Sequence, residues 1–294
     1  MTFFRRYKGR GSYDLFSNYN HYLPGVGGMF LLFVLFLLGA LLGNLLVMLF
    51  QFVSPEFAKE YGTVLSYPVM FIPPMLYASA KSRSNEFIPW GSDGLEPSGV
   101  PLDSNNFGRL GGWKMGLIVS VATMATAFIT EPVSALLPEM PEFLKQALEQ
   151  VTEGPLWVSL LSVSIFAPLF EEWLCRGLVL RGLLQKMHPA SAILISAAFF
   201  AVLHMNPWQA IPAFVLGVLF GYVYYKTGSL KLTMLMHCVN NTMAVVLSRI
   251  PSLSDAETLM EVMSPWAYAC VYAACVLFVA ATVVVLKGIA KEKA

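Results

Sequence analysis

Charged side chains are scarce in this sequence. Asp, Glu, Lys and Arg make up 13% of its 294 residues, whereas 56% are hydrophobic. A soluble domain carries about 25% charged residues, so the deficit argues against an ordinary soluble protein. The formal net charge is only +1, which provides no overall positive charge for binding nucleic acid. The composition therefore predicts a membrane protein that does not bind nucleic acid.

The sequence also lacks the features of several other classes. Its four cysteines show no CxxC spacing and predict neither a zinc site nor a redox site. No internal repeat is apparent, so a transporter built from inverted repeats has no support. The apolar run that begins near residue 29 is too long for the core of a signal peptide and predicts a helix that stays in the membrane.

Apolar stretches recur along the chain. A transmembrane helix needs about 20 mostly apolar residues, and eight stretches reach or approach that length. They cover residues 29–52, 63–80, 113–135, 156–184, 189–206, 208–225, 230–248 and 265–287. We therefore expect an all-α fold, a polytopic transmembrane helical bundle of about eight spans.

Basic residues are distributed unevenly between the segments that join these stretches. With a cytoplasmic N-terminus and eight crossings, 16 of the 19 Lys and Arg residues fall on the cytoplasmic side. The other three are Lys59, Lys145 and Arg249. Because basic residues concentrate in cytoplasmic segments, this asymmetry predicts that both termini lie in the cytoplasm. We expect a multi-pass protein of the cell membrane, and specifically of a bacterial inner membrane.

These spans divide the chain into four segments. Residues 1–27 form a cytoplasmic N-terminal segment, and residues 28–155 form the N-terminal spans with a cytoplasmic loop at 82–112. Residues 156–248 form a core that contains most of the polar residues within spans. Residues 249–294 form the last span and a cytoplasmic tail.

Ionisable side chains inside a membrane are costly and point to functional sites. In this chain they concentrate in the fourth, fifth and seventh apolar stretches. Together with one amide they are Glu171, Glu172, Arg176, His204, His237 and Asn241. The second half of the chain is therefore the place to look for a functional site.

The spacing of these residues predicts two groups. Glu172 and Arg176 are four residues apart and can pair on one helix face, whereas Glu171 points about 100° away. His237 and Asn241 are also four residues apart and would present two hydrogen-bond donors side by side, as an oxyanion site needs. Each group also has a purely structural interpretation, as an ion pair or as a hydrogen bond between helices.

The depth of the two histidines in the membrane is less consistent. At about 1.5 Å per residue, His204 lies about 22 Å from the cytoplasmic start of its span, and His237 only about 10 Å from its own. The two side chains meet only if the spans are tilted or begin at different depths.

Three motifs, in this order, resemble those of a known family. The segments are Glu171-Glu172-Trp-Leu-Cys-Arg176, which matches EExxxR, Phe200-Ala-Val-Leu-His204, which matches FxxxH, and His237-Cys-Val-Asn-Asn241, which matches HxxxN. Over residues 156–248 the chain resembles the CAAX prenyl protease and bacteriocin-processing family, called CPBP or Abi.

The resemblance implies an intramembrane endopeptidase. It implies that Glu171 and His204 activate a water molecule, and that His237 and Asn241 stabilise the oxyanion of the tetrahedral intermediate. The second glutamate and the arginine of the first motif are expected to support the first glutamate.

The resemblance also bears on substrate and cofactor. It implies a peptide or membrane-protein substrate in the lipid bilayer, with a prenylated substrate less expected than another peptide. The family has often been called metalloproteases, and two Glu and two His side chains could bind a divalent ion. The sequence has no HExxH, in which two histidines one turn apart hold zinc. We therefore expect no cofactor, with a divalent metal ion as the alternative.

Two other functions stay open at this point. One is a non-enzymatic membrane partner or immunity protein that retains the family scaffold. The other is a transporter that uses Glu and His side chains as a proton relay. Peptide cleavage by the purified protein, compared with that of the variants Glu171→Gln and His204→Ala, distinguishes an enzyme from both.

Overall fold

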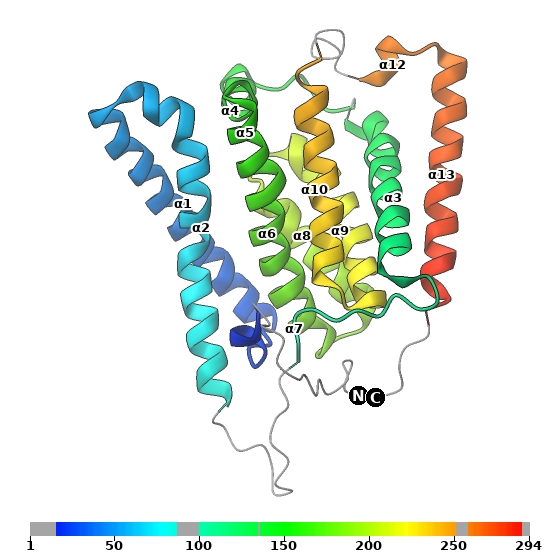
Figure 1. Ribbon diagram of the computed structural model, residues 1–294, viewed down its shortest axis with the longest axis horizontal. Helices are drawn as coiled ribbons and strands as arrows, with labels where there is room; N and C mark the ends of the chain where they lie inside the picture. The colour runs from blue at the N-terminus through cyan, green and yellow to red at the C-terminus, as the bar shows by residue number, and fades with distance from the viewer. Residues whose placement is uncertain (1–15, 87–99, 135, 251–257, 290–294) are drawn as a thin grey trace, which may run out of the picture.

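A computed structural model describes residues 16–86, 100–134, 136–250 and 258–289 of the chain (Figure 1). All regular secondary structure within these ranges is helical, which confirms the all-α prediction. The helices are η1 (Ser17–Tyr19), α1 (Val26–Val53), α2 (Pro55–Glu86), α3 (Gly111–Ser134), α4 (Glu142–Glu153), α5 (Leu156–Ser159), η2 (Leu160–Phe166), α6 (Ala167–Glu172), η3 (Trp173–Leu180), α7 (Arg181–Leu184), α8 (Pro189–Leu203), α9 (Pro207–Thr227), α10 (Leu230–Leu247), α12 (Leu259–Val262) and α13 (Pro265–Lys287).

Six helices among the described residues are long and apolar enough to cross a membrane. They are α1, α3, the continuous run from α5 to α7, α9, α10 and α13. The two other expected spans correspond to α2, which contains three prolines in its interior, and to α8, which has 15 residues. The chain is thus a multi-pass membrane protein, and eight is an approximate count of its spans.

The helices stand side by side in one bundle (Figure 1). The pair formed by α1 and α2 lies at one edge, and α3 and α13 pack together at the other. The α5–α7 run, α8, α9 and α10 lie between them. The short helix η1 and the C-terminal end of α13 lie at the same end of the bundle, as an even number of spans requires.

Residues 100–106, within the expected loop 82–112, are irregular in backbone and pack against the helix bundle. Helix α2 continues to Glu86, and residues 100–106 follow the turn between α9 and α10. The N–H groups of Ser104 and Asn106 donate to the carbonyls of Gly228 and Thr227, at 2.8 and 3.1 Å. Sequence composition does not show that the polar backbone groups of this loop find partners elsewhere in the chain.

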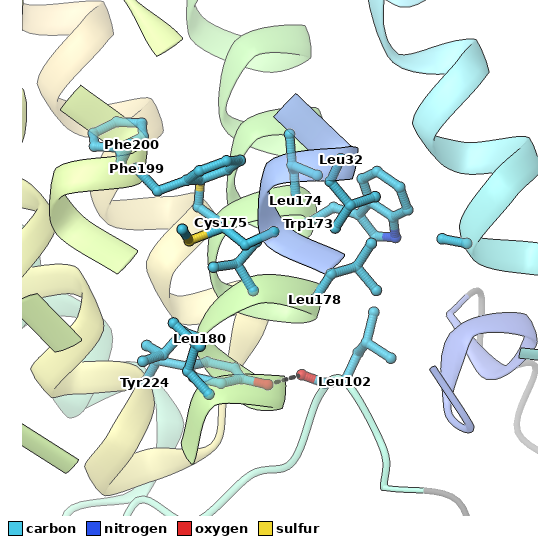
Figure 2. Close-up of a cluster of buried hydrophobic side chains, with 14 of the residues drawn as sticks. Leu32, Leu102, Trp173, Leu174, Cys175, Leu178, Leu180, Phe199, Phe200 and Tyr224 are labelled. Carbon is cyan, nitrogen blue, oxygen red and sulfur yellow. Dashed lines mark hydrogen bonds between the residues drawn. The ribbon is translucent and has the colours of Figure 1, made fainter. Parts of the chain in front are cut away.

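The largest apolar cluster surrounds η3 (Figure 2). Leu174, Cys175 and Leu178 are fully buried in it. Leu102, from the 100–106 segment, is also fully buried, and its carbonyl accepts a 2.8 Å hydrogen bond from the hydroxyl of Tyr224 on α9. The cluster therefore fixes the helix run that carries the first sequence motif.

A buried arginine ties three segments together at this end of the bundle. Arg181, which is fully buried, donates to the carbonyls of Tyr19 and Tyr22 at 2.8 and 2.7 Å, and also to the carbonyl of Val100. The guanidinium thereby joins the chain before α1, the 100–106 segment and α7. We call this arrangement the Arg181 cluster, defined by Tyr19, Tyr22, Val100 and Arg181.

Candidate functional site

The first motif lies on a helix run with irregular winding. Two π-helical segments, η2 and η3, flank the single α-helical segment α6, which ends at Glu171 and Glu172. Within η2 the N–H of Ala167 bonds the carbonyl of Ser162, five residues earlier. Segments of π-helix are rare and occur frequently at functional sites. The wider winding also leaves some carbonyls without a donor in the next turn.

Glu172 and Arg176 form the ion pair that their spacing predicts. Arg176 Nη1 lies 2.7 Å from Glu172 Oε1, and both side chains are fully buried. Arg176 Nη2 donates to the carbonyl of Gly217 on α9 at 3.1 Å. The guanidinium also lies over the rings of Phe200 and Phe220, at 4.5 and 5.3 Å from their centroids. Counter-charge, carbonyl and aromatic faces together compensate for its burial.

His237, on α10, contacts both glutamates. Its Nδ1 lies 3.1 Å from Glu172 Oε1, and its Nε2 lies 4.0 Å from Glu171 Oε2. A carboxylate paired with Arg176 is only an acceptor, so Nδ1 carries the proton that Glu172 accepts. Nε2 has a lone pair when the ring is neutral and is a donor only when the ring is doubly protonated.

Glu171 has a partner that the sequence did not reveal. The hydroxyl of Tyr67, on α2, donates to Glu171 Oε1. The other oxygen, Oε2, is buried and has no hydrogen-bond partner among the described residues. No motif or spacing places a tyrosine 104 residues away beside this carboxylate, so only the packing of α2 against the site shows the contact.

Asn241 is held by a carbonyl of the π-helical segment. Its Nδ2 donates to the Val163 carbonyl at 2.8 Å, and its Oδ1 accepts a 3.1 Å hydrogen bond from Asn240. The Val163 carbonyl is available because the N–H of Ala167 bonds elsewhere and Pro168, the next residue, has no N–H. Local helix irregularity thus creates the acceptor that orients this amide.

His204 follows the last residue of α8, and one aromatic ring packs against both it and His237. Phe200 meets the imidazole of His204 edge-on at 5.1 Å and that of His237 edge-on at 5.3 Å between centroids. His204 Nδ1 lies 3.0 Å from the Phe200 carbonyl. The two histidines therefore approach one ring although their distances along the spans differ.

The turn after His204 is tightly constrained. Met205 has a φ of 52°, an uncommon conformation for a residue with a side chain. Asn206 donates to the His204 carbonyl at 2.9 Å, and its side chain accepts from the N–H of Gln209 to cap α9. These contacts fix the end of α8 and with it the position of the histidine.

The structure places four of the predicted residues in direct contact and the other two beside them. Glu171, Glu172, Arg176 and His237 form one contact network. His204 and Asn241 lie beside it, each linked to the network through one further residue or helix segment, and no described hydrogen bond joins either of them to Glu171.

Several polar atoms of this donor set are engaged by protein partners. In the described ranges no group of three His, Cys, Asp or Glu side chains converges as a ligand set would. Glu172 Oε1 already accepts from Arg176 and His237, and Glu171 Oε1 accepts from Tyr67. A zinc site needs three or four side chains that all point to one position.

Comparison with known proteins gives one match. A family model described as "Rce1-like: Type II CAAX prenyl endopeptidase Rce1-like" matches residues 153–243. No curated protein and no solved structure matches the chain. The matched residues contain all three motifs and all six predicted site residues, which confirms the resemblance seen in the sequence. Over residues 153–243 this membrane protein is therefore similar to the Rce1-like, type II CAAX prenyl endopeptidase family.

Proposed function

We propose that this chain is an intramembrane endopeptidase that hydrolyses a peptide bond of a peptide or membrane-associated substrate. The observation that carries the proposal is the environment of Glu171. Its carboxylate is almost buried, with 12% of the side chain exposed, and its Oε2 faces His237 Nε2 at 4.0 Å. This arrangement lies within the residues that match an endopeptidase family.

The distance between these two atoms suits a bridging water. A direct hydrogen bond spans 2.7–3.2 Å, so 4.0 Å is too long for one. A bent bridge through one water accommodates this separation. In the proposed reaction Glu171 Oε2 takes a proton from the water while the water oxygen attacks the scissile carbonyl carbon. The same proton then passes to the amine nitrogen that leaves when the C–N bond breaks.

His204 is proposed as the partner of Glu171 in activating the water. Its ring packs against Phe200, as does the ring of His237, so the end of α8 brings it next to the network. Because its Nδ1 lies beside the Phe200 carbonyl, Nε2 is the ring atom left to meet the water or the substrate.

Charge balance supports an oxyanion role for His237. The network contains two carboxylates and one guanidinium, so a doubly protonated His237 makes it neutral. Buried charge is tolerated best when it is compensated in this way. The doubly protonated ring also has the Nε2 donor that a developing oxyanion needs.

Asn241 is proposed as the second oxyanion donor. One hydrogen of its Nδ2 is engaged by the Val163 carbonyl, which fixes the plane of the amide. The other hydrogen stays available for the substrate oxygen. An amide fixed before the substrate binds needs no reorganisation when charge develops.

The test uses full-length protein purified into lipid nanodiscs and a library of membrane-associated peptides, with cleavage products identified by mass spectrometry. We expect wild type to cleave, and Glu171→Gln and His204→Ala to lose at least about 100-fold in kcat. In water enriched in ¹⁸O, the new C-terminal carboxyl carries one labelled oxygen.

Glu131→Gln is the matched control. This carboxylate accepts from the N–H of Leu259 and the hydroxyl of Tyr268, far along the chain from the motifs. The Glu131→Gln variant should cleave the peptides as wild type does. If wild type cleaves no peptide, or if Glu171→Gln cleaves as fast as wild type, the protein is not this enzyme.

A further inference from the structure

Tyr67 lies outside the matched residues 153–243 and nevertheless contacts the centre of the proposed site. It belongs to α2, and its hydroxyl donates to Glu171 Oε1. Its ring stacks on Phe71 at 5.9 Å and 24°, and Phe71 stacks in turn on Phe170 at 5.2 Å and 15°. Phe170 is the residue before Glu171, so this aromatic column connects α2 to the start of the first motif.

The hydroxyl makes the two oxygens of the carboxylate different. Oε1 is engaged by Tyr67, whereas Oε2 has no described hydrogen-bond partner and faces His237 Nε2. A carboxylate that is held at one oxygen cannot rotate freely about its last bond. The lone pairs of the other oxygen then keep one direction, which is the requirement for a base that must meet a water at a fixed place.

We infer that Tyr67 is a positioning residue for the hydrolytic reaction. Its hydrogen bond to Glu171 Oε1 leaves Oε2 as the proton acceptor. The inference rests on the proposed function, because it assigns a partner to the base proposed there. It also makes α2 part of the reaction site, although the family match begins almost 70 residues after this helix ends. The stacked rings fix the position of the Tyr67 hydroxyl, and this hydroxyl fixes the orientation of the Glu171 carboxylate.

A purely structural tyrosine would behave differently. It would lower the stability of the protein when its hydroxyl is removed, but would leave the turnover of folded molecules unchanged. A positioning residue changes kcat and leaves KM almost unchanged, because the misplaced base affects the transition state and not substrate binding. The two roles are therefore separable by kinetics.

The experiment compares Tyr67→Phe with wild type as full chains in nanodiscs. The substitution keeps the ring and its stacking and removes only the hydroxyl. We expect kcat to fall about 10- to 100-fold and KM to stay within about twofold. Tyr77→Phe is the control on the same helix, since its ring packs edge-on against Tyr22 at 5.7 Å, away from the site. It should retain the kcat of wild type.

A second measurement does not depend on activity. In a thermal-unfolding cycle of Tyr67→Phe, Glu171→Gln and the double variant, the two single effects should not add, since Tyr67→Phe removes the hydrogen bond that Glu171→Gln weakens by taking away the acceptor's charge. Wild-type kcat in Tyr67→Phe, an equal loss in Tyr77→Phe, or additive unfolding effects would each overturn the inference. Activity in Glu171→Gln would instead contradict the proposed function itself.

Discussion

Two fully buried arginines lie five residues apart on one helix run, and the protein compensates for their charges in different ways. Arg176 pairs with Glu172 at 2.7 Å and lies against Phe200 and Phe220. Arg181 has no acidic partner in the described parts of the chain. It donates instead to three backbone carbonyls of the Arg181 cluster.

The difference teaches what each charge is for. An ionised counter-charge belongs to a network in which the charge of each group affects the protonation of the others, as a reaction site requires. Backbone carbonyls do not change their charge and serve only as fixed acceptors. Such acceptors suit a group that holds chain segments in place. Arg176 thus belongs to the proposed chemistry, and Arg181 to the frame around it.

The largest effect is expected from Arg176→Met. It leaves Glu172 buried without its counter-charge, which should destabilise the protein by about 3–5 kcal/mol. It should also abolish cleavage, because the carboxylate that orients His237 is then disturbed. Thermal unfolding in detergent and peptide cleavage measure the two effects.

The double variant Glu172→Leu, Arg176→Met provides the control for this prediction. Removing both charges should recover much of the lost stability, because apolar side chains replace a buried ion pair at little cost. Activity should stay absent, since His237 Nδ1 loses its acceptor. A double variant that cleaves as wild type would show that the pair plays no part in the reaction.

Arg181→Met should have a smaller effect, of about 2–3 kcal/mol. It removes hydrogen bonds from a charged donor to three carbonyls, and water can replace part of them at this end of the bundle. The segments around Tyr19 and Val100 should become sensitive to added protease, whereas kcat per folded molecule stays within about twofold of wild type. A loss of kcat as large as that of Arg176→Met would remove the distinction between the two arginines.

Two glycines test the same comparison through packing. A Cβ at Gly182 would lie 2.2 Å from the Pro24 carbonyl oxygen, whereas one at Gly217 would lie 3.1 Å from Ala197 Cβ and 3.3 Å from Arg176 Nη2. Gly182→Ala should therefore cost about 2–3 kcal/mol of stability and Gly217→Ala about 1 kcal/mol. Only Gly217→Ala should alter kcat, because only it displaces Arg176. The reverse pattern in stability and turnover would contradict this assignment.

The smallest effect is expected from Asp103→Asn. Asp103 pairs at 3.1 Å with Lys231, whose side chain is 70% exposed, and it also accepts hydrogen bonds that asparagine can still accept. The Asp103 side chain is only 9% exposed, but because the Lys231 ammonium is solvated we expect the pair to contribute about 0.2–1 kcal/mol, as exposed pairs do. The shift in unfolding should shrink at high salt, which screens such pairs. A salt-independent shift above this range would mean that Asp103 holds the 100–106 segment more firmly than an exposed pair does.

Sequence reasoning succeeded where the relevant contact is local. The pairing of Glu172 with Arg176 follows from a four-residue spacing, and the helices follow from long apolar runs. It was less informative where backbone groups find distant partners. Residues 100–106 lie in the expected loop, but composition does not show that the acceptors of Ser104 and Asn106 lie on the turn between α9 and α10, more than 100 residues later.

The two histidines illustrate the same limit. Counting residues along straight spans placed His204 and His237 at different depths, and yet both rings contact Phe200. The register of one helix against another is set by side-chain packing over the whole interface. No count along a single helix contains that information.

The sequence by itself determined that this is a helical membrane protein, that the ionisable residues within its spans gather in residues 156–248, and that three motifs carry them. Only the tertiary structure decided that Tyr67 donates to Glu171, that the Val163 carbonyl holds Asn241, and that Arg181 joins three segments. The physical reason is the range of each interaction. Hydropathy and spacing report on neighbours within a few helical turns, whereas these contacts link groups between 78 and 162 residues apart and depend on how every helix packs against the next.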